Sequence, residues 1–196
     1  MKKLVIATQN RDKFKEMREA LTGAGWDLLP AFDFPGMPEV VEDGQTLEEN
    51  SLKKAQAVSS FTGLPALADD TGLFVEALDG RPGIYAARFA GENCSYLDNV
   101  AKLLDSLKKI PGSSRKAVFR TVVTLFFPED KPRQVVGEVA GEIVEEARGS
   151  CGFGYDPVFK PLSSSKVFSE MSVEEKNILS HRGKAVREAR KLLEEI

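Results

Sequence analysis

The sequence has few of the residues that several kinds of site require. Only one histidine, His181, occurs among the 196 residues, which excludes a zinc site built from several histidines. Any bound metal should therefore be a hard cation held by carboxylates. The two cysteines, Cys94 and Cys151, lie far apart without a C-x-x-C spacing, so we expect both to be free thiols.

An excess of basic charge and long apolar runs are also absent. The chain has 27 Lys and Arg residues against 30 Asp and Glu residues, a net charge of −3, and it lacks the basic excess typical of nucleic-acid binding. The apolar run at residues 4–7 is shorter than a signal-peptide core of about 7 to 15 residues. No stretch approaches the about 20 apolar residues of a membrane span. We expect a cytoplasmic protein that binds neither nucleic acid nor membranes.

The overall composition is that of a folded globular protein. Hydrophobic residues make up 42% of the chain and charged residues 29%, values near those of ordinary soluble domains. Because one domain takes roughly 150 residues, we expect residues 1–196 to form a single domain with two lobes.

Strand and helix patterns alternate along the chain. Apolar runs predict strands over residues 3–7, 27–30, 64–68, 72–77, 117–127 and 134–145. Capping residues predict helices that begin near Asn10, Thr46, Ser95 and Ser172. In the helix after Ser95, the spacing of residues 97, 100, 104 and 107 predicts a buried face. These patterns, with the last two strands as an antiparallel pair, predict an α/β fold with a mixed sheet, flanking helices and a cleft between two lobes.

The segment Asn10-Arg11-Asp12-Lys13 opens the first predicted helix. Asn10 is a good N-cap, and the backbone N–H groups of Arg11, Asp12 and Lys13 should be free in the first turn. Positive side chains are unfavourable at a helix N-terminus, so Arg11 and Lys13 indicate that an anion such as phosphate completes the site. An ordinary capped helix with solvated side chains is the alternative.

The segment Asp69-Asp70-Thr71-Gly72 follows an apolar strand at its C-terminal end, where α/β sheets usually bind ligands. Consecutive strand residues point to opposite faces, so one aspartate should face the cleft while the other supports a turn. A turn held only by its own aspartates is the structural alternative. Glu42, on the acidic loop before the second helix, could supply a carboxylate for Mg²⁺ or could be solvated surface.

Two further segments combine glycine, aromatic and charged residues. Residues 149–157 contain three glycines with Phe153, Tyr155 and Asp156, so a planar base could stack there, or the glycines could make a tight turn with Phe153 in the core. Residues 180–185 place His181 beside Arg182 at a helix start. That pair favours an anion or a carbonyl acceptor, although a lone histidine is more often structural.

Together these segments resemble the inosine/xanthosine triphosphate pyrophosphatase family. The resemblance runs in order from residue 4 to residue 193 and rests on 8–13 (TQNRDK), Glu42 with 46–50 (TLEEN), 68–73 (ADDTGL), 82–89 (PGIYAARF), 152–157 (GFGYDP) and 180–185 (SHRGKA). Six segments in order are far more specific than any one of them. Thr71 stands where the family usually has Ser and keeps a hydroxyl, and Leu47 stands where the family usually has Phe.

The resemblance implies Mg²⁺-dependent hydrolysis of inosine, deoxyinosine and xanthosine triphosphates (ITP, dITP and XTP) to monophosphate and pyrophosphate, which cleanses the nucleotide pool. It also implies an elongated sheet and a homodimer. Asp70 would be the catalytic base and a metal ligand, and Glu42 would help to hold Mg²⁺. The phosphates would be bound by Thr8, Gln9, Asn10, Arg11, Asp12 and Lys13. Thr71 would touch the substrate, and the base and adjoining groups would be surrounded by Phe153, Gly154, Tyr155, Asp156, Lys176, His181 and Arg182.

The residue types suit this chemistry and leave two other interpretations open. Donors from Arg182 or the backbone would pair with O6 of a 6-oxo purine, whereas adenine would leave them unpaired. One alternative is a pyrophosphatase of the related septum-inhibitor family, which acts on pyrimidine or modified nucleotides but lacks the GFGYD and SHR segments. The other is a nucleotide-sensing module without hydrolysis, which loss of the acidic residues Glu42, Asp69 and Asp70 would have favoured.

Overall fold

The structure, a computed structural model, describes residues 2–196. Met1, part of the single domain predicted over residues 1–196, lies outside the described residues. The chain divides into two compact units. The first comprises the chain up to Asp70, together with Thr121–Gly137 and Arg182–Ile196, and the second comprises Thr71–Arg120 and Glu138–His181.

Helices and strands alternate along most of the chain. The helices are α1 (Arg11–Ala20), α2 (Leu47–Thr62), α3 (Tyr96–Ser106), α4 (Val173–Leu179) and α5 (His181–Glu194). The strands are β1 (Lys2–Ile6), β2 (Trp26–Pro30), β3 (Ala66–Val75), β4 (Pro82–Gly83), β5 (Lys116–Phe126), β6 (Arg133–Ile143) and β7 (Phe159–Pro161).

The strands form one mixed sheet. Their order is β2-β1-β3-β5-β6-β7, with β4 paired to β3. β1 is parallel to β2 and to β3, whereas β4 is antiparallel to β3 and β7 is antiparallel to β6. The predicted α/β class and mixed sheet are confirmed.

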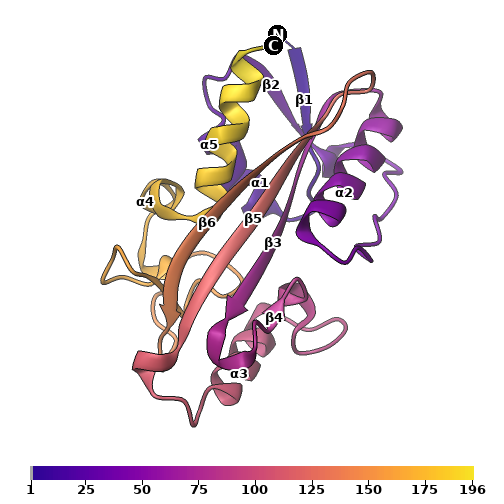
Figure 1. Ribbon diagram of the computed structural model, residues 1–196. Coiled ribbons are helices and arrows are strands. Elements are labelled where there is room, and N and C mark those ends of the chain that lie inside the picture. The colour runs from indigo at the N-terminus through magenta and orange to yellow at the C-terminus, as the bar shows by residue number, and fades with distance from the viewer. Residues whose placement is uncertain (1) are drawn as a thin grey trace. The chain divides into compact units, whose positions relative to one another are not determined.

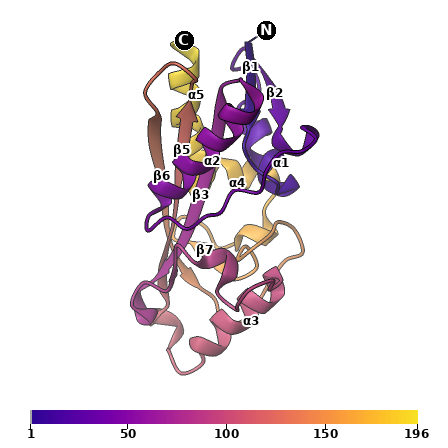
Figure 2. The same ribbon diagram turned by 90° about the vertical axis from the view of Figure 1, so that its right-hand side faces the viewer.

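In the first unit, helices cover both faces of the sheet. Side chains alternate along β1: Leu4 and Ile6 pack in a buried cluster with residues of α1 and α5, and Val5 packs in another cluster with residues of α2. Figure 1 shows α5 and α2 on opposite sides of the strands, and α2 faces the viewer in Figure 2. Because each apolar side chain contributes about 1.5–3 kcal/mol when buried, this alternation fixes the register of β1 between its neighbours.

The second unit has an aromatic core. The ring centroids of Phe119 and Phe159 are 4.6 Å apart, and those of Phe159 and Phe168 are 5.2 Å apart. His181 stacks on Phe119 with its ring centroid at 4.3 Å and an interplanar angle of 13°. The only histidine of the chain is therefore part of this core.

The predicted buried face of α3 is confirmed except at its first position. Val100, Leu104 and Leu107 lie in or against the core as predicted. Leu97 is instead 76% exposed, and Asn99 is buried. Asn99 turns inward because its side chain donates to the carbonyl of Ala87 and accepts from the N–H of Ala90. A polar anchor that bonds to the backbone thus sets the rotation of this helix, and the apolar spacing alone could not show it.

β3 continues through the segment that was expected to interrupt it. It pairs with β1 at Ala66 and Leu67 and with β4 at Leu73 and Phe74. Asp69 and Asp70 therefore lie within β3, immediately after its pairing with β1 ends, and the expected interruption is wrong. Gly72 permits the later pairing, because a Cβ atom there would lie 2.9 Å from the carbonyl oxygen of Gly83.

The predicted helix caps and free thiols are confirmed. The side chains of Asn10, Thr46, Ser95 and Ser172 each accept from backbone N–H groups at the starts of α1, α2, α3 and α4. Cys94 and Cys151 are not in disulfides. Within residues 2–196, no helix has the length and apolar character needed to cross a membrane.

Candidate functional site

Charged side chains from several elements meet in the first unit. This charged cluster consists of Lys13 and Glu16 on α1, Glu42 on the loop before α2, Lys54 on α2, Asp69 and Asp70 on β3, and Arg182 on α5. Buried ionised groups are costly unless they are paired. The pairing within the cluster therefore decides what each member can do.

Asp69 is held firmly as a carboxylate. Its side chain is 1% exposed, with the ammonium of Lys13 at 3.4 Å and the guanidinium of Arg182 at 3.0 Å. Burial alone would raise the pKa of this carboxyl, but Lys13 and Arg182 outweigh that effect and hold its pKa well below the usual range. The alternation along a strand predicted that one of the two aspartates has a supporting role. That aspartate is Asp69.

Arg182 lies between two buried carboxylates. Its Nη1 is 2.7 Å from Oε2 of Glu16, while its Nε donates to Asp69. Burial lowers the pKa of the guanidinium, but Asp69 and Glu16 outweigh burial, so the pKa of Arg182 lies above its ordinary value. The structure therefore favours a role for Arg182 in positioning Asp69 over the base contact expected from the sequence, and that contact stays a prediction.

Asp70 has a carboxylate oxygen available in a buried position. Its Oδ1 is 3.4 Å from the ammonium of Lys54, whereas its buried Oδ2 has no hydrogen-bond partner among the described residues. Burial raises the pKa of Asp70, Lys54 opposes the rise, and Glu42 adds to it. Because buried polar atoms are nearly always paired, this oxygen is the place in the cluster where a ligand proton or a cation would be bound.

Lys54 lies between two carboxylates. Its ammonium is 3.1 Å from Oε1 of Glu42 and 3.4 Å from Oδ1 of Asp70. Burial lowers the pKa of Lys54, but the two carboxylates outweigh this and raise it. Lys54 thus neutralises part of the charge that Asp70 and Glu42 share.

The donor set suits a hard cation that is bound together with a substrate. In the part of the chain that the structure describes, no three His, Cys, Asp or Glu side chains are grouped closely enough to hold a metal by themselves. Mg²⁺ is usually held by one or two carboxylates, with waters and substrate phosphates as its other ligands. Asp70 and Glu42, with the unpartnered oxygen of Asp70, fit that requirement.

The start of α1 corrects one expectation. The side-chain oxygen of Asn10 accepts from the N–H groups of Asp12 at 2.9 Å and Lys13 at 3.1 Å. The N–H of Asn10 itself donates to the hydroxyl of Thr8. The first-turn donors of Asp12 and Lys13 are therefore not free, because the cap that was predicted at Asn10 already satisfies them.

The side chains of residues 8–13 point in different directions. Lys13 reaches the charged cluster, and its pKa is lowered because burial outweighs the attraction of Asp69. Arg11 lies 4.6 Å from the ring centroid of Phe32, and Gln9 and Asp12 are exposed. Among the side chains predicted to bind phosphate, Lys13 is the one that forms an ion pair with Asp69.

In the second unit, the loop of residues 152–156 is built around Asp156. Its Oδ2 accepts from the N–H of Phe153 at 2.9 Å and from the ammonium of Lys176 at 2.5 Å. Gly152 has φ +78°, and a Cβ there would collide with the Asp156 carboxylate. Phe153 is half-buried, and the ammonium of Lys176 lies 4.6 Å from its ring centroid. The buried ammonium of Lys176, paired with Asp156, thus lies over the ring of the half-buried Phe153, and placing Phe153 in the core is wrong.

Two other predicted site residues are core residues of the second unit. Tyr155 is 5% exposed, its hydroxyl donates to the carbonyl of Ala86, and burial raises its pKa. His181 is buried on Phe119. Thr71 and Gly154 are half-buried. The structural alternative stated for His181 thus describes its side chain, and Tyr155 is likewise a core residue.

Glu16, Lys54 and Tyr96 were not found from the sequence. Glu16 lies one helical turn after Lys13, and Lys54 lies one turn after Asn50 and Ser51 on the buried face of α2. A charged residue at the spacing of a buried face is the signal that could have identified both. Tyr96, whose ring lies 5.9 Å from that of Phe153, carries no such signal because its partner is remote in sequence.

The fold and the charged cluster define an α/β protein with a buried network of ion pairs and one carboxylate oxygen that has no protein partner among the described residues. The comparison with protein families identifies it further: the chain belongs to the Ham1 family, whose model matches residues 4–192.

Individual relatives and solved structures match nearly the whole chain. A dITP/XTP pyrophosphatase of Geobacter sulfurreducens is 48% identical over 186 residues, which cover 95% of this chain and 94% of that protein. The dITP/XTP pyrophosphatase of Bacillus subtilis is 41% identical, with 99% and 98% covered. The structure of a HAM1 protein from Coxiella burnetii superposes with a TM-score of 0.89 at 38% identity and covers 100% of both chains.

Proposed function

We propose that this protein hydrolyses deaminated purine nucleoside triphosphates, namely dITP, ITP and XTP, to the nucleoside monophosphate and pyrophosphate. Family membership and the names of relatives 41–48% identical support this substrate class. The observation that carries the chemistry is Asp70, whose buried Oδ2 has no protein partner among the described residues, while its Oδ1 is 3.4 Å from the ammonium of Lys54.

We propose Mg²⁺ as the cofactor, with Asp70 and Glu42 as its protein ligands. The ion would neutralise charge on the phosphates and polarise the bond that is cleaved. The support for this assignment is the paired carboxylates and the unpartnered oxygen of Asp70.

The residues of the chain divide the remaining work. Asp70 takes a proton from the water that attacks the α-phosphate, because its carboxylate has a buried oxygen without a protein partner among the described residues. Lys13 neutralises charge that develops on the phosphates. Asp69 and Arg182 hold Lys13 in place through the 3.4 Å and 3.0 Å contacts of the Asp69 carboxylate. Neither a Ser nor a Cys nucleophile is required.

We assign recognition of the base to the loop of residues 152–156 and to Lys176. Phe153 offers a stacking surface, and the ammonium of Lys176 beside it can donate to O6 of a 6-oxo purine. Adenine carries an amino group at that position, which cannot accept a hydrogen bond from Lys176, so adenine nucleotides are discriminated against. We also propose a homodimer, which the family resemblance supports, and a cytoplasmic location, which the short apolar run at residues 4–7 supports.

The two alternatives have less support. The relatives reported above are named for dITP and XTP, which gives no reason to propose pyrimidine nucleotides as substrates. A sensing module would not need the carboxylates Glu42, Asp69 and Asp70, all of which are present in the charged cluster.

The test is turnover on a panel of nucleoside triphosphates with Mg²⁺, measured as pyrophosphate release. We expect kcat/KM for dITP, ITP and XTP to exceed that for ATP by at least about a hundredfold, because a missing hydrogen-bond partner in a polar site is strongly rejected. Chelation with EDTA should abolish turnover, and added Mg²⁺ should restore it. Release of orthophosphate, equal rates on pyrimidine nucleotides, or binding without turnover would each contradict the proposal.

A further inference from the structure

Tyr96, the first residue of α3, presents an aromatic ring to Phe153. The two ring centroids are 5.9 Å apart with an interplanar angle of 42°, within the range of favourable aromatic pairs. Tyr96 is 45% exposed, and Phe153 is half-buried. Both residues belong to the second unit.

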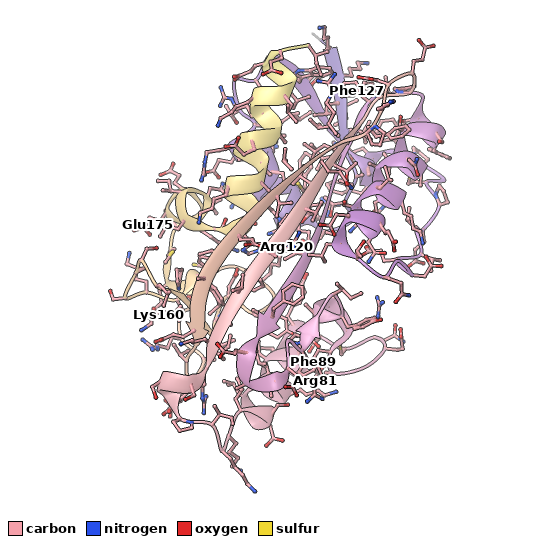
Figure 3. All side chains as sticks on the ribbon, in the orientation of Figure 1. Arg81, Phe89, Arg120, Phe127, Lys160 and Glu175 are labelled. Carbon is pink, nitrogen blue, oxygen red and sulfur yellow. The ribbon has the colours of Figure 1, made fainter. Side chains whose placement is uncertain are left out.

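The backbone beneath Tyr96 is firmly held. The capping box of Ser95 and Asp98 fixes the first turn of α3, and Asn99 bonds to the backbone of Ala87 and Ala90. Lys102, one turn further along α3, donates to the carbonyl of Phe89, which is labelled in Figure 3. The position of Tyr96 is thus fixed by its helix, and only its ring torsions are variable.

Tyr96 continues the buried face of α3 to the end of the helix. Val100 and Leu103 follow it at the i+4 and i+7 positions, and both are buried. Tyr96 is the first residue on the buried face of α3, at the edge of the core, and its aromatic ring is partly exposed there. Its neighbour there is Phe153.

Phe153 is held from the other direction by its backbone and by Lys176. Its N–H donates to Asp156, and Lys176 is fixed by the same carboxylate. The ammonium of Lys176 also lies over the ring itself, 4.6 Å from its centroid. The ring of Tyr96 packs against the Phe153 ring as a second contact and restrains its side-chain torsions further.

We propose that Tyr96 is a positioning residue for base recognition: it holds the ring of Phe153 at the angle that stacking requires. This inference rests on the proposed function, because it gives Tyr96 a role at the base-binding residues of that site. Tyr96 acts through Phe153 and therefore affects binding of the base and not the chemical step.

The test compares Tyr96→Ala, Tyr96→Leu and Tyr96→Phe with the wild type on ITP and XTP. We expect Tyr96→Ala and Tyr96→Leu to raise KM by about three- to tenfold with kcat unchanged, which is the size of effect that one aromatic pair gives. Tyr96→Phe keeps the ring and should retain the wild-type KM. Leu97→Ala, at the neighbouring residue that is 76% exposed, is the matched control and should change neither constant.

Product inhibition separates base binding from phosphate binding. In Tyr96→Ala the inhibition constant of inosine monophosphate should rise in parallel with KM, while that of inorganic pyrophosphate should stay the same. A double variant with Phe153→Ala should show no additional loss from the Tyr96 change, because the residue it positions is gone.

The results of these experiments can overturn the proposed role of Tyr96. A wild-type KM in Tyr96→Leu, a fall in kcat, or an equal rise in both inhibition constants would overturn the role of Tyr96. Loss of folding in Tyr96→Ala would leave the Leu and Phe variants as the deciding pair. A wild-type protein that does not hydrolyse ITP or XTP would instead refute the proposed function itself, and the two failures are therefore distinguishable.

Discussion

Asp69 and Asp70 are neighbours on β3, yet their charges have opposite effects on stability. The folded state lowers the pKa of Asp69 through Lys13 and Arg182, which more than offset its burial, so ionised Asp69 stabilises the fold. It raises the pKa of Asp70, chiefly by burial, so ionised Asp70 destabilises the fold. A destabilising charge that is retained beside an unpartnered oxygen is typical of a residue kept for chemistry.

The pair of substitutions Asp70→Asn and Asp69→Asn makes this contrast measurable. Asp70→Asn should lower kcat on ITP by about 10²- to 10⁴-fold, the usual contribution of a general base, and should leave the melting temperature unchanged or higher. Asp69→Asn should lower the melting temperature, because Arg182 and Lys13 lose a buried ionic partner. Steady-state kinetics and thermal unfolding at pH 7 measure both. Wild-type kcat in Asp70→Asn would show that the base is another group.

Arg182 provides a second prediction for a single residue. Arg182→Ala should destabilise the protein by about 3–5 kcal/mol at pH 7, because Asp69 and Glu16 would remain buried without their partner. The folded pKa of Asp69 lies below its ordinary value of 3.8, so its stabilising contribution is complete above that pH and is lost as the pH falls further. The difference in unfolding free energy between wild type and variant should therefore shrink as the pH falls from 5 to 3.

Urea unfolding at pH 7, 5 and 3 measures this difference, and kinetics on ITP and ATP distinguish the two roles considered for Arg182. A positioning role predicts a proportional loss on both substrates. An unchanged unfolding midpoint with a lower ratio of kcat/KM for ITP to that for ATP would assign Arg182 to base contact, as the sequence predicts. Arg182→Lys, which keeps the charge but loses the planar fork, should be intermediate in stability.

At the scale of elements, local patterns predicted the helices well. The caps at Asn10, Thr46, Ser95 and Ser172 are local, since a side chain bonds to a backbone group two or three residues away. Such signals are complete within a short segment of sequence. The strands over 117–127 and 134–145 were also predicted within two residues of β5 and β6.

Features that depend on remote partners could not be predicted in the same way. Asp69-Asp70-Thr71 has the composition of a turn, but pairing with β4 and ion pairs to α1, α2 and α5 keep β3 extended there. Arg182 was placed near the base from its neighbours in sequence, whereas Asp69 lies 113 positions away. The motifs thus identified most of the charged cluster, and its pairing had to come from the fold.

At the scale of the whole molecule, the chain passes between the two units inside regular elements. The crossings fall within β3 at Asp70 and Thr71, within β5, within β6, and in the first turn of α5. Boundaries between independent domains usually lie in exposed linkers, where few interactions are broken. Neither unit is a continuous piece of chain. Because each unit is assembled from separate segments, the sequence contains no signal of a boundary between them.

This connectivity predicts that the two units unfold together, as the single domain expected over residues 1–196 requires. Unfolding one unit would break β3, β5 and β6 in their middles, because each of these strands has residues in both units. Differential scanning calorimetry should therefore show one transition, with calorimetric and van't Hoff enthalpies in a ratio near one. Mg²⁺ with inosine monophosphate should raise the transition temperature as a bound ligand does without splitting it. Two resolved transitions, or a fragment of residues 71–120 that folds alone, would contradict cooperative unfolding and would make the units separate domains.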